Sequence, residues 1–190
     1  MFVRSIRFLT AQLIALSFAL SANALVVVQR DFADLVARAE QIVIGTVVDI
    51  KLGQNALGSP VTLVTVGDLS VLKGSVGNEM TLQIYGGGNT HIADLPEFKE
   101  GDRAVLFVAG NGRDVCPLVG VGQGRFRVRF DAQRNEDVVD TNDGRMVVGR
   151  EKRSLRFAPA STASANALSV DEFRQMISDE LASPSQATGQ

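Results

Sequence analysis

Apolar residues recur at every second position through most of this chain, and this period of two constrains the fold more than any other feature of the sequence. The pattern places alternate side chains on opposite faces of a β-strand. Five such runs are rich in β-branched or aromatic residues and are bounded by glycine-containing turns, which predicts strands. The runs cover residues 41–51, 61–72, 80–85, 103–109 and about 118–130. We therefore expect a mainly β protein.

The fifth run ends in the sequence RFRVRF, where apolar residues and arginines alternate strictly. Strand geometry then predicts a core-facing set and a solvent-facing set: Phe126, Val128 and Phe130 against Arg125, Arg127 and Arg129. A weaker hairpin is expected after this strand. Its arms are residues 138–139 and 146–148, and its turn is Asn142-Asp143-Gly144, which suits positive φ angles.

Two segments depart from the alternation and predict helices. Asp31 can cap a short helix in which Phe32, Leu35, Val36 and Ala39 share one face. A second helix is expected over residues 170–182, because Ser169 and Glu172 form a capping box. Its apolar face, made by Val170, Phe173, Ile177 and Leu181, is expected to pack on the strands or on a partner.

Composition predicts the remaining boundaries of the chain. Residues 158–169 are rich in alanine and serine and predict a linker, and residues 183–190 predict a disordered tail. At the other end, Arg4 and Arg7 precede an apolar run of about 13 residues and the small residues Ala22-Asn23-Ala24. This is the pattern of a signal peptide over residues 1–24, and the run is shorter than a membrane-spanning helix. The main domain is then residues 25–157, in a periplasmic or secreted protein.

Charge and cysteine content narrow the partners that the exported chain would meet. Removal of Arg4 and Arg7 from the 19 basic residues leaves 17 against 21 acidic residues, a net charge of −4. Such a balance gives no general attraction to nucleic acid or to anionic membranes, so we expect neither as a partner. Cys116 is the single cysteine, which excludes a disulfide within the chain and leaves open a pairing between chains.

The stretch YGGGNTH, residues 85–91, combines three glycines with the single histidine of the chain. A phosphate-binding loop would need lysine and serine or threonine after the last glycine, and Asn89 stands there instead. His91, Asp94 and Glu97 would share one face of a helix as metal ligands, but Pro96 argues against a helix. We interpret the stretch as a corner in which glycines adopt positive φ, and we expect neither a metal nor a cofactor.

Other motifs favour structural roles. Glycines 120, 122 and 124 lack the last glycine of a dinucleotide fingerprint and lead into a strand, so they suit curvature or a bulge. Residues 140–144 resemble a calcium loop, but glycine stands at a ligand position, and a turn is the better interpretation. Cys116 would need the distant His91 as a base to act as a nucleophile.

The arginine row is the most suggestive binding feature. Three cations on one strand face can contact phosphate, sulfate or an acidic partner. The candidate binding residues are Arg125, Arg127, Arg129, Tyr85 and His91. Nucleic-acid binding on such a face would also require stacking aromatic residues, and the chain has no tryptophan and one tyrosine.

The order of sequence blocks resembles a known family. A short helix is followed by IVIGTV, VLKG, PEFKEGDRAVLF and VGVGQGRFRV over residues 31–130. This order resembles the OB-fold barrel of TIMP and netrin modules, and uncharacterised exported bacterial proteins with the same blocks. The resemblance implies a five-stranded OB-like barrel with a short N-terminal helix and a C-terminal amphipathic helix. The protease inhibitors of that family act through an N-terminal cysteine, and this chain has none there.

The resemblance leaves the function open, because OB barrels bind oligonucleotides, oligosaccharides and proteins. We expect an exported, non-catalytic binding module whose partner is an extracytoplasmic protein or polymer. One alternative is an inhibitor of an exported protease that inserts residues 86–100 or the N-terminal edge into a cleft. The other is an enzyme that uses His91 or Cys116.

Overall fold

The computed structural model describes residues 28–88, 92, 95–158 and 166–182. The predicted signal peptide, His91, most of the predicted linker and the predicted tail lie outside the described residues.

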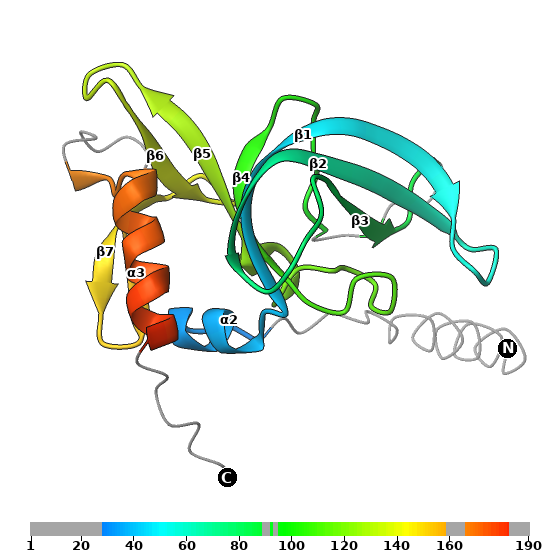
Figure 1. Ribbon diagram of the computed structural model, residues 1–190, viewed down its shortest axis with the longest axis horizontal. Helices are drawn as coiled ribbons and strands as arrows, with labels where there is room; N and C mark the ends of the chain where they lie inside the picture. Colours follow the sequence, from blue (N-terminus) through cyan, green and yellow to red (C-terminus); the bar gives the residue numbers. More distant parts are fainter. Residues whose placement is uncertain (1–27, 89–91, 93–94, 159–165, 183–190) are drawn as a thin grey trace, which may run out of the picture.

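The described residues form one antiparallel sheet of eight strands and two α-helices (Figure 1). The strands are β1 (Gln41–Gln54), β2 (Pro60–Lys73), β3 (Met80–Tyr85), β4 (Arg103–Val108), β5 (Arg125–Asp131), β6 (Glu136–Thr141), β7 (Met146–Glu151) and β8 (Ser154–Ala158). Their order across the sheet is β3-β2-β1-β4-β5-β6-β7-β8. The helices are α2 (Phe32–Arg38) and α3 (Val170–Ala182), and a short 3-10 helix, η1 (Val121–Gly124), precedes β5.

The prediction of a mainly β chain with two helices is confirmed, and the closed five-stranded barrel is not found. Three strands continue the sheet beyond β5, and β3 and β8 are its two edges in the described part of the chain. The predicted hairpin around Gly144 is confirmed as β6 and β7, with φ of 84° at Gly144. The start of the predicted fifth strand is wrong. Leu118 makes an isolated bridge to Val108, and η1 separates it from β5.

Two neighbouring strands, β4 and the first half of β1 (residues 42–47), are buried on both faces. One face turns toward the helices and carries Ile42, Ile44, Val105 and Phe107. The other face belongs to a second cluster with β2 and β3 and carries Val43, Val47, Leu106 and Val108. This explains the continuous apolar sequences IVI and AVLFV, because a strand covered on both sides has no solvent face to fill with polar residues.

The edge of β3 is covered by the loop that follows β4. The Asn111 side chain accepts from the Gln83 amide at 2.9 Å and donates to the Thr81 carbonyl at 2.8 Å. Tyr85 donates its amide to the Val115 carbonyl at 2.8 Å. A strand edge carries unpaired donors and acceptors that invite pairing with other chains, and this loop satisfies part of that need.

Both predicted helix caps are confirmed. The Asp31 carboxylate accepts from the Asp34 amide at 2.7 Å. The Glu172 amide donates to the Ser169 hydroxyl at 3.2 Å, and the Glu172 carboxylate accepts from the Ser169 amide at 2.8 Å, which completes the capping box. Just before this box, the Leu168 carbonyl accepts from the Val139 amide and the Leu168 amide donates to the Val147 carbonyl. The last residues of the predicted linker therefore pack on the sheet.

The apolar face of α3 packs into the protein's own core beside α2, on the side of β5–β7 (Figure 1). The Phe173 ring is fully buried and lies 5.7 Å from the ring of Phe32 and 4.9 Å from that of Phe126. The buried carboxylate of Glu180 pairs with Arg150 of β7. Residues 170–182 thus form an integral layer of the domain.

Truncation of Phe173 tests this packing. We expect Phe173→Ala to lower the free energy of unfolding by about 3–5 kcal/mol, because it empties a fully buried site beside the rings of Phe32 and Phe126. Gln175→Ala, on the exposed face of the same helix, is expected to change it by at most about 0.5 kcal/mol. Urea unfolding followed by circular dichroism measures both. Equal stabilities of the two variants would contradict the role of α3.

Candidate functional site

A pocket of about 900 Å³ lies between the start of α2, η1, the β6–β7 turn and β8. Its floor is apolar and consists of Phe32, Leu35, Phe126, Leu155 and Phe157. Its rim is polar and carries Arg30, Asp31, Gln123, Asn142, Asp143 and Arg145. We call the space bounded by these residues the α2–β8 pocket. An apolar floor with a few placed polar groups is the usual composition of a ligand site.

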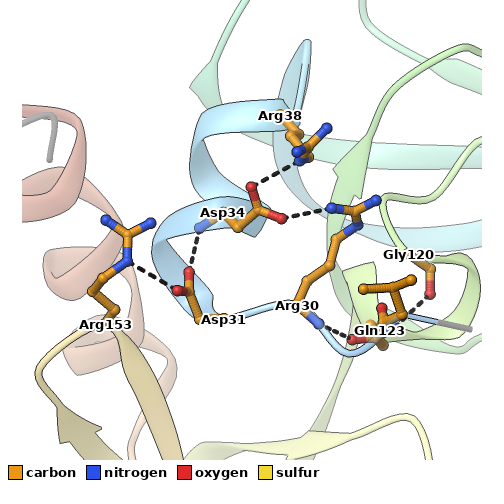
Figure 2. Close-up of polar contacts among 8 residues, drawn as sticks. Arg30, Asp31, Asp34, Arg38, Gly120, Gln123 and Arg153 are labelled. Atoms are coloured by element: carbon orange, nitrogen blue, oxygen red, sulfur yellow. Dashed lines mark hydrogen bonds and ion pairs between the residues drawn. The ribbon is translucent and has the colours of Figure 1, made fainter. Parts of the chain in front are cut away.

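One side chain, Gln123, fixes the chain segment that enters α2 against η1. Its Oε1 accepts from the Arg30 amide at 2.8 Å, and its Nε2 donates to the Val28 carbonyl at 3.0 Å (Figure 2). The same Nε2 lies 3.2 Å from the Gly120 carbonyl. The side-chain amide of Gln123 therefore both accepts from and donates to the backbone of residues 28–30, as the backbone of a neighbouring strand does. This pairing holds one wall of the pocket in place.

The α2 side of the rim is held by ion pairs. Asp34 accepts from Arg30 Nη1 and from Arg38 Nε, each at 2.7 Å, and Asp31 pairs with Arg153 at 2.9 Å (Figure 2). Burial alone would raise the pKa of Asp34, but the hydrogen bonds from the two arginines outweigh it and lower that pKa. The hydrogen bond to Asp31 raises the pKa of Arg153.

The opposite side of the rim is the β6–β7 turn. Asp143 accepts from the Thr141 hydroxyl and from Arg145 Nε, the latter at 2.9 Å. Burial acts to raise the pKa of Asp143, but these two donors lower it overall. The guanidinium of Arg145 lies over the Phe157 ring, 4.5 Å from its centroid. On both sides of the pocket, therefore, each of these charged groups has a partner of opposite charge.

The third wall, η1, has an unusual backbone. Gly120 and Val121 adopt φ of 64° and 62°, and a β-branched residue rarely does so. A Cβ at Gly124 would lie 2.9 Å from the Phe107 carbonyl oxygen, so only glycine lets η1 approach β4 this closely. The glycines of GVGQG therefore form a tight wall against the central strand, whereas the sequence suggested curvature or a bulge within a strand.

The expectation that Arg125 faces solvent is wrong. Its side chain is 4% exposed, pairs with Asp102 at 2.7 Å and donates to the Asn142 side chain at 3.1 Å. It also donates to the Glu97 carbonyl and lies over the Phe98 ring, 4.2 Å from its centroid. Burial lowers the pKa of Arg125, and Asp102 opposes that change. The cause is the loop before β4, which covers the start of β5.

The expectation for Phe130 is wrong as well, since its side chain is 61% exposed. Phe130 pairs with Asp137 near the β5–β6 turn, at the end of β5 opposite to the covered Arg125. Arg129 is held by Asp140 at 2.6 Å and lies 3.7 Å from Asp131. Arg127 is exposed and forms no ion pair within the described residues. The predicted row of three solvated arginines is therefore reduced to Arg127.

Tyr85 lies at a second, smaller pocket of about 310 Å³, whose lining also includes Glu97 and Phe98, the two residues that contact Arg125. His91 lies outside the described residues. The corner predicted for YGGGNTH is confirmed at its glycines, which all have positive φ. A Cβ at Gly87 would lie 2.7 Å from the Thr62 hydroxyl, so this corner needs glycine.

Cys116 is buried, and burial raises the pKa of its thiol. A thiol with a raised pKa is a weak nucleophile at neutral pH. No group of three metal-ligating side chains occurs among residues 28–88, 92, 95–158 and 166–182.

No protein-family model, curated protein sequence or solved structure matches this chain. The resemblance to the TIMP and netrin barrels therefore stays a prediction from the sequence blocks. Within the part of the chain that the structure describes, neither helix has the length and apolar content needed to cross a bilayer.

Two walls of the α2–β8 pocket stood out in the sequence as glycine motifs, GVGQG and Asn142-Asp143-Gly144. Each motif predicted only a local structural role, and neither indicated that the two segments meet. Their meeting depends on β5 pairing with β6, which brings Phe126 opposite Thr141. Arg30 and Gln123 carried no recognisable signal, and β8 was not predicted at all.

The buried arginine is testable by substitution. We expect Arg125→Ala to lower the free energy of unfolding by about 2–4 kcal/mol, because the Glu97 carbonyl and the Asp102 carboxylate lose their donor. Asp102 is partly exposed and regains water, which keeps the loss below that of a fully buried pair. The matched control Arg127→Ala, two residues along β5, should stay within about 0.5 kcal/mol. Urea unfolding measures the free energy of unfolding of both variants. Similar losses of stability would refute the difference between a buried Arg125 and an exposed Arg127.

The α2 ion pairs predict a specific acid response. Since the folded-state pKa of Asp34 lies below its ordinary value of 3.8, its contribution to stability is complete above that value. The contribution is lost as pH falls from about 4 through the folded-state pKa. Asp34→Asn should therefore flatten the decline in stability across this acid range. Urea midpoints from pH 6 to about 2 measure it, with the exposed Asp171→Asn as control. An unchanged slope would contradict the proposed pairing.

Proposed function

We propose that this protein is an exported, non-catalytic binding module that holds a partner in the α2–β8 pocket. The observation that carries the proposal is the make-up of the pocket, an apolar floor under a rim whose charges are already paired. Burial of the half-exposed floor residues Leu155 and Phe157 by a partner would supply affinity, and the fixed rim would supply orientation.

The state of the rim carboxylates favours binding over proton transfer. A general acid or base works best with a pKa near the working pH. The pKa of the rim residue Asp143 is instead lowered by the Thr141 hydroxyl and by Arg145. The pKa of Asp34, which holds the rim residue Arg30, is lowered by Arg30 and Arg38, so both carboxylates stay ionised near neutral pH. These carboxylates act as fixed anchors for the arginines around the pocket.

The finer fold assignment and the export of the chain belong to the same proposal. β1 pairs with both β2 and β4, and the loop after β4 hydrogen-bonds to β3. These contacts bring β3 and the segment after β4 together on one side of β1 and β2. They support an OB-like arrangement of β1–β5, extended by β6–β8. The basic and apolar pattern of residues 1–24 supports export.

Arg127 lies beside the β6–β7 turn, 4.0 Å from where a Cβ of Gly144 would stand, and can meet a partner at the outer rim.

An affinity capture with a blocked pocket tests the proposal. The purified chain is used as bait in the extracytoplasmic fraction of its own cells, beside Ser154→Trp and Ser178→Trp. Ser154 is exposed and lines the pocket, so its tryptophan should fill the opening and abolish capture of the partner. Ser178 is exposed on α3 and gives the same substitution away from the pocket.

We expect wild type and Ser178→Trp to retain one partner that Ser154→Trp loses, with all three chains melting within a few degrees of each other. Capture of the same partner by Ser154→Trp would refute the pocket as the binding site. Conversion of a captured molecule by the purified chain would refute the non-catalytic assignment.

A further inference from the structure

The outer edge of β8 runs beside the α2–β8 pocket, and this juxtaposition suggests what the pocket binds. Ser154, Leu155 and Phe157 of β8 all line the pocket. In the described part of the chain no strand pairs with the outer edge of β8, whereas the other sheet edge, β3, is covered by the loop after β4. Within the described residues, the β3 edge is therefore covered by a loop, whereas the β8 edge has no neighbouring strand.

The register of the β7–β8 hairpin determines which backbone groups face outward. Glu151 and Ser154 flank a two-residue turn, so they exchange both of their hydrogen bonds with each other. Inward and outward orientation then alternates along an antiparallel strand. Arg156, opposite Gly149, also turns its backbone groups toward β7. The amide and carbonyl groups of Leu155 and Phe157 therefore point to the open edge.

The side chains of these two residues lie on the side of the sheet that the helices cover. Leu155 and Phe157 pack against the cluster that contains Phe32 and Phe126, and all four line the pocket. A peptide strand added to β8 would place every second side chain over this apolar floor. The intervening side chains would lie on the other side of the sheet, beside Arg156, which is exposed.

Charge distinguishes a peptide of another protein from a second copy of this chain. Arg156 forms no ion pair with any described residue, and Lys152 in the adjoining turn is exposed. Antiparallel pairing of two β8 strands over their full length would place Arg156 opposite Arg156, and like charges directly opposite destabilise a sheet. An acidic residue at that position would instead be attracted.

We propose that β8 binds an extended peptide segment of a partner protein as a ninth strand, with apolar residues in the α2–β8 pocket and acidic residues beside Arg156. The inference rests on the proposed function and specifies its partner. The recognition mode is strand addition, in which backbone hydrogen bonds supply affinity and alternate side chains supply specificity.

Synthetic peptides of about seven residues, enough to span a strand of ordinary length, provide the probe. One alternates valine with glutamate, and its counterpart alternates valine with lysine. We expect the wild-type chain to bind the glutamate peptide at least about tenfold more tightly by calorimetry, from Coulomb attraction to Arg156 and Lys152. Arg156→Glu should reverse this preference, and Lys51→Glu, exposed on β1 and absent from the pocket lining, should leave it unchanged. Equal affinity for both peptides would overturn the charge assignment.

The backbone contact is tested separately. Leu155→Pro removes the outward amide, whereas Leu155→Ala removes the side chain and keeps that amide, and proline is tolerated at a strand edge. We expect Leu155→Pro to bind at least about tenfold more weakly than Leu155→Ala. Amide hydrogen exchange at Leu155 and Phe157 should also slow in the wild-type chain when the peptide binds. Equal binding by both variants, together with unchanged exchange, would overturn strand addition.

The natural partner separates this inference from the proposed function. Loss of the captured partner in Ser154→Trp but full retention in Leu155→Pro and Arg156→Glu would leave the pocket as the site and refute the ninth strand. Loss in all three variants, with stronger capture by Leu155→Ala than by Leu155→Pro, would support both.

Discussion

Burial of β1 and β4 on both faces is the constraint on which the rest of the structure depends. Because β4 and residues 42–47 of β1 have no solvent face, the sheet needs a cover on each side there. The helices supply one cover through Phe32 and Phe173, and the curl of β2 and β3 supplies the other. Near β8, Phe32 and Leu35 of α2 meet the apolar residues of β5 and β8, and together they form the floor of the α2–β8 pocket.

The sequence predicted those features that depend on residues close together in the chain. The caps at Asp31 and Ser169 each need a partner only three residues away, and the β6–β7 turn needs Gly144 within the turn itself. Burial of Arg125 could not be predicted in this way. Its partners Asp102 and Glu97 lie 23 and 28 residues away in sequence, and strict alternation assigned it to solvent. Alternation identifies the two faces of a strand but not what covers each face.

The pocket was missed for a related reason. Strand β8 is the five-residue sequence SLRFA, which follows a charged stretch and shows only two apolar alternations. A strand this short is held by its pairing with β7 and by the contact of Phe157 with Arg145, and neither is visible in local composition. The residues that line the pocket come from four separate segments, and only the sheet register brings them together.

The two edges of the sheet show how one physical hazard is met in two ways. Open strand edges invite association with other chains, and a covering loop or a charged side chain reduces that risk. At β3 the loop around Asn111 satisfies the backbone directly. At β8 no strand covers the backbone within the described residues, and protection falls to Arg156, which repels an identical edge, beside the exposed Lys152. The same two cations attract an acidic strand, so the device that opposes self-association also selects a partner.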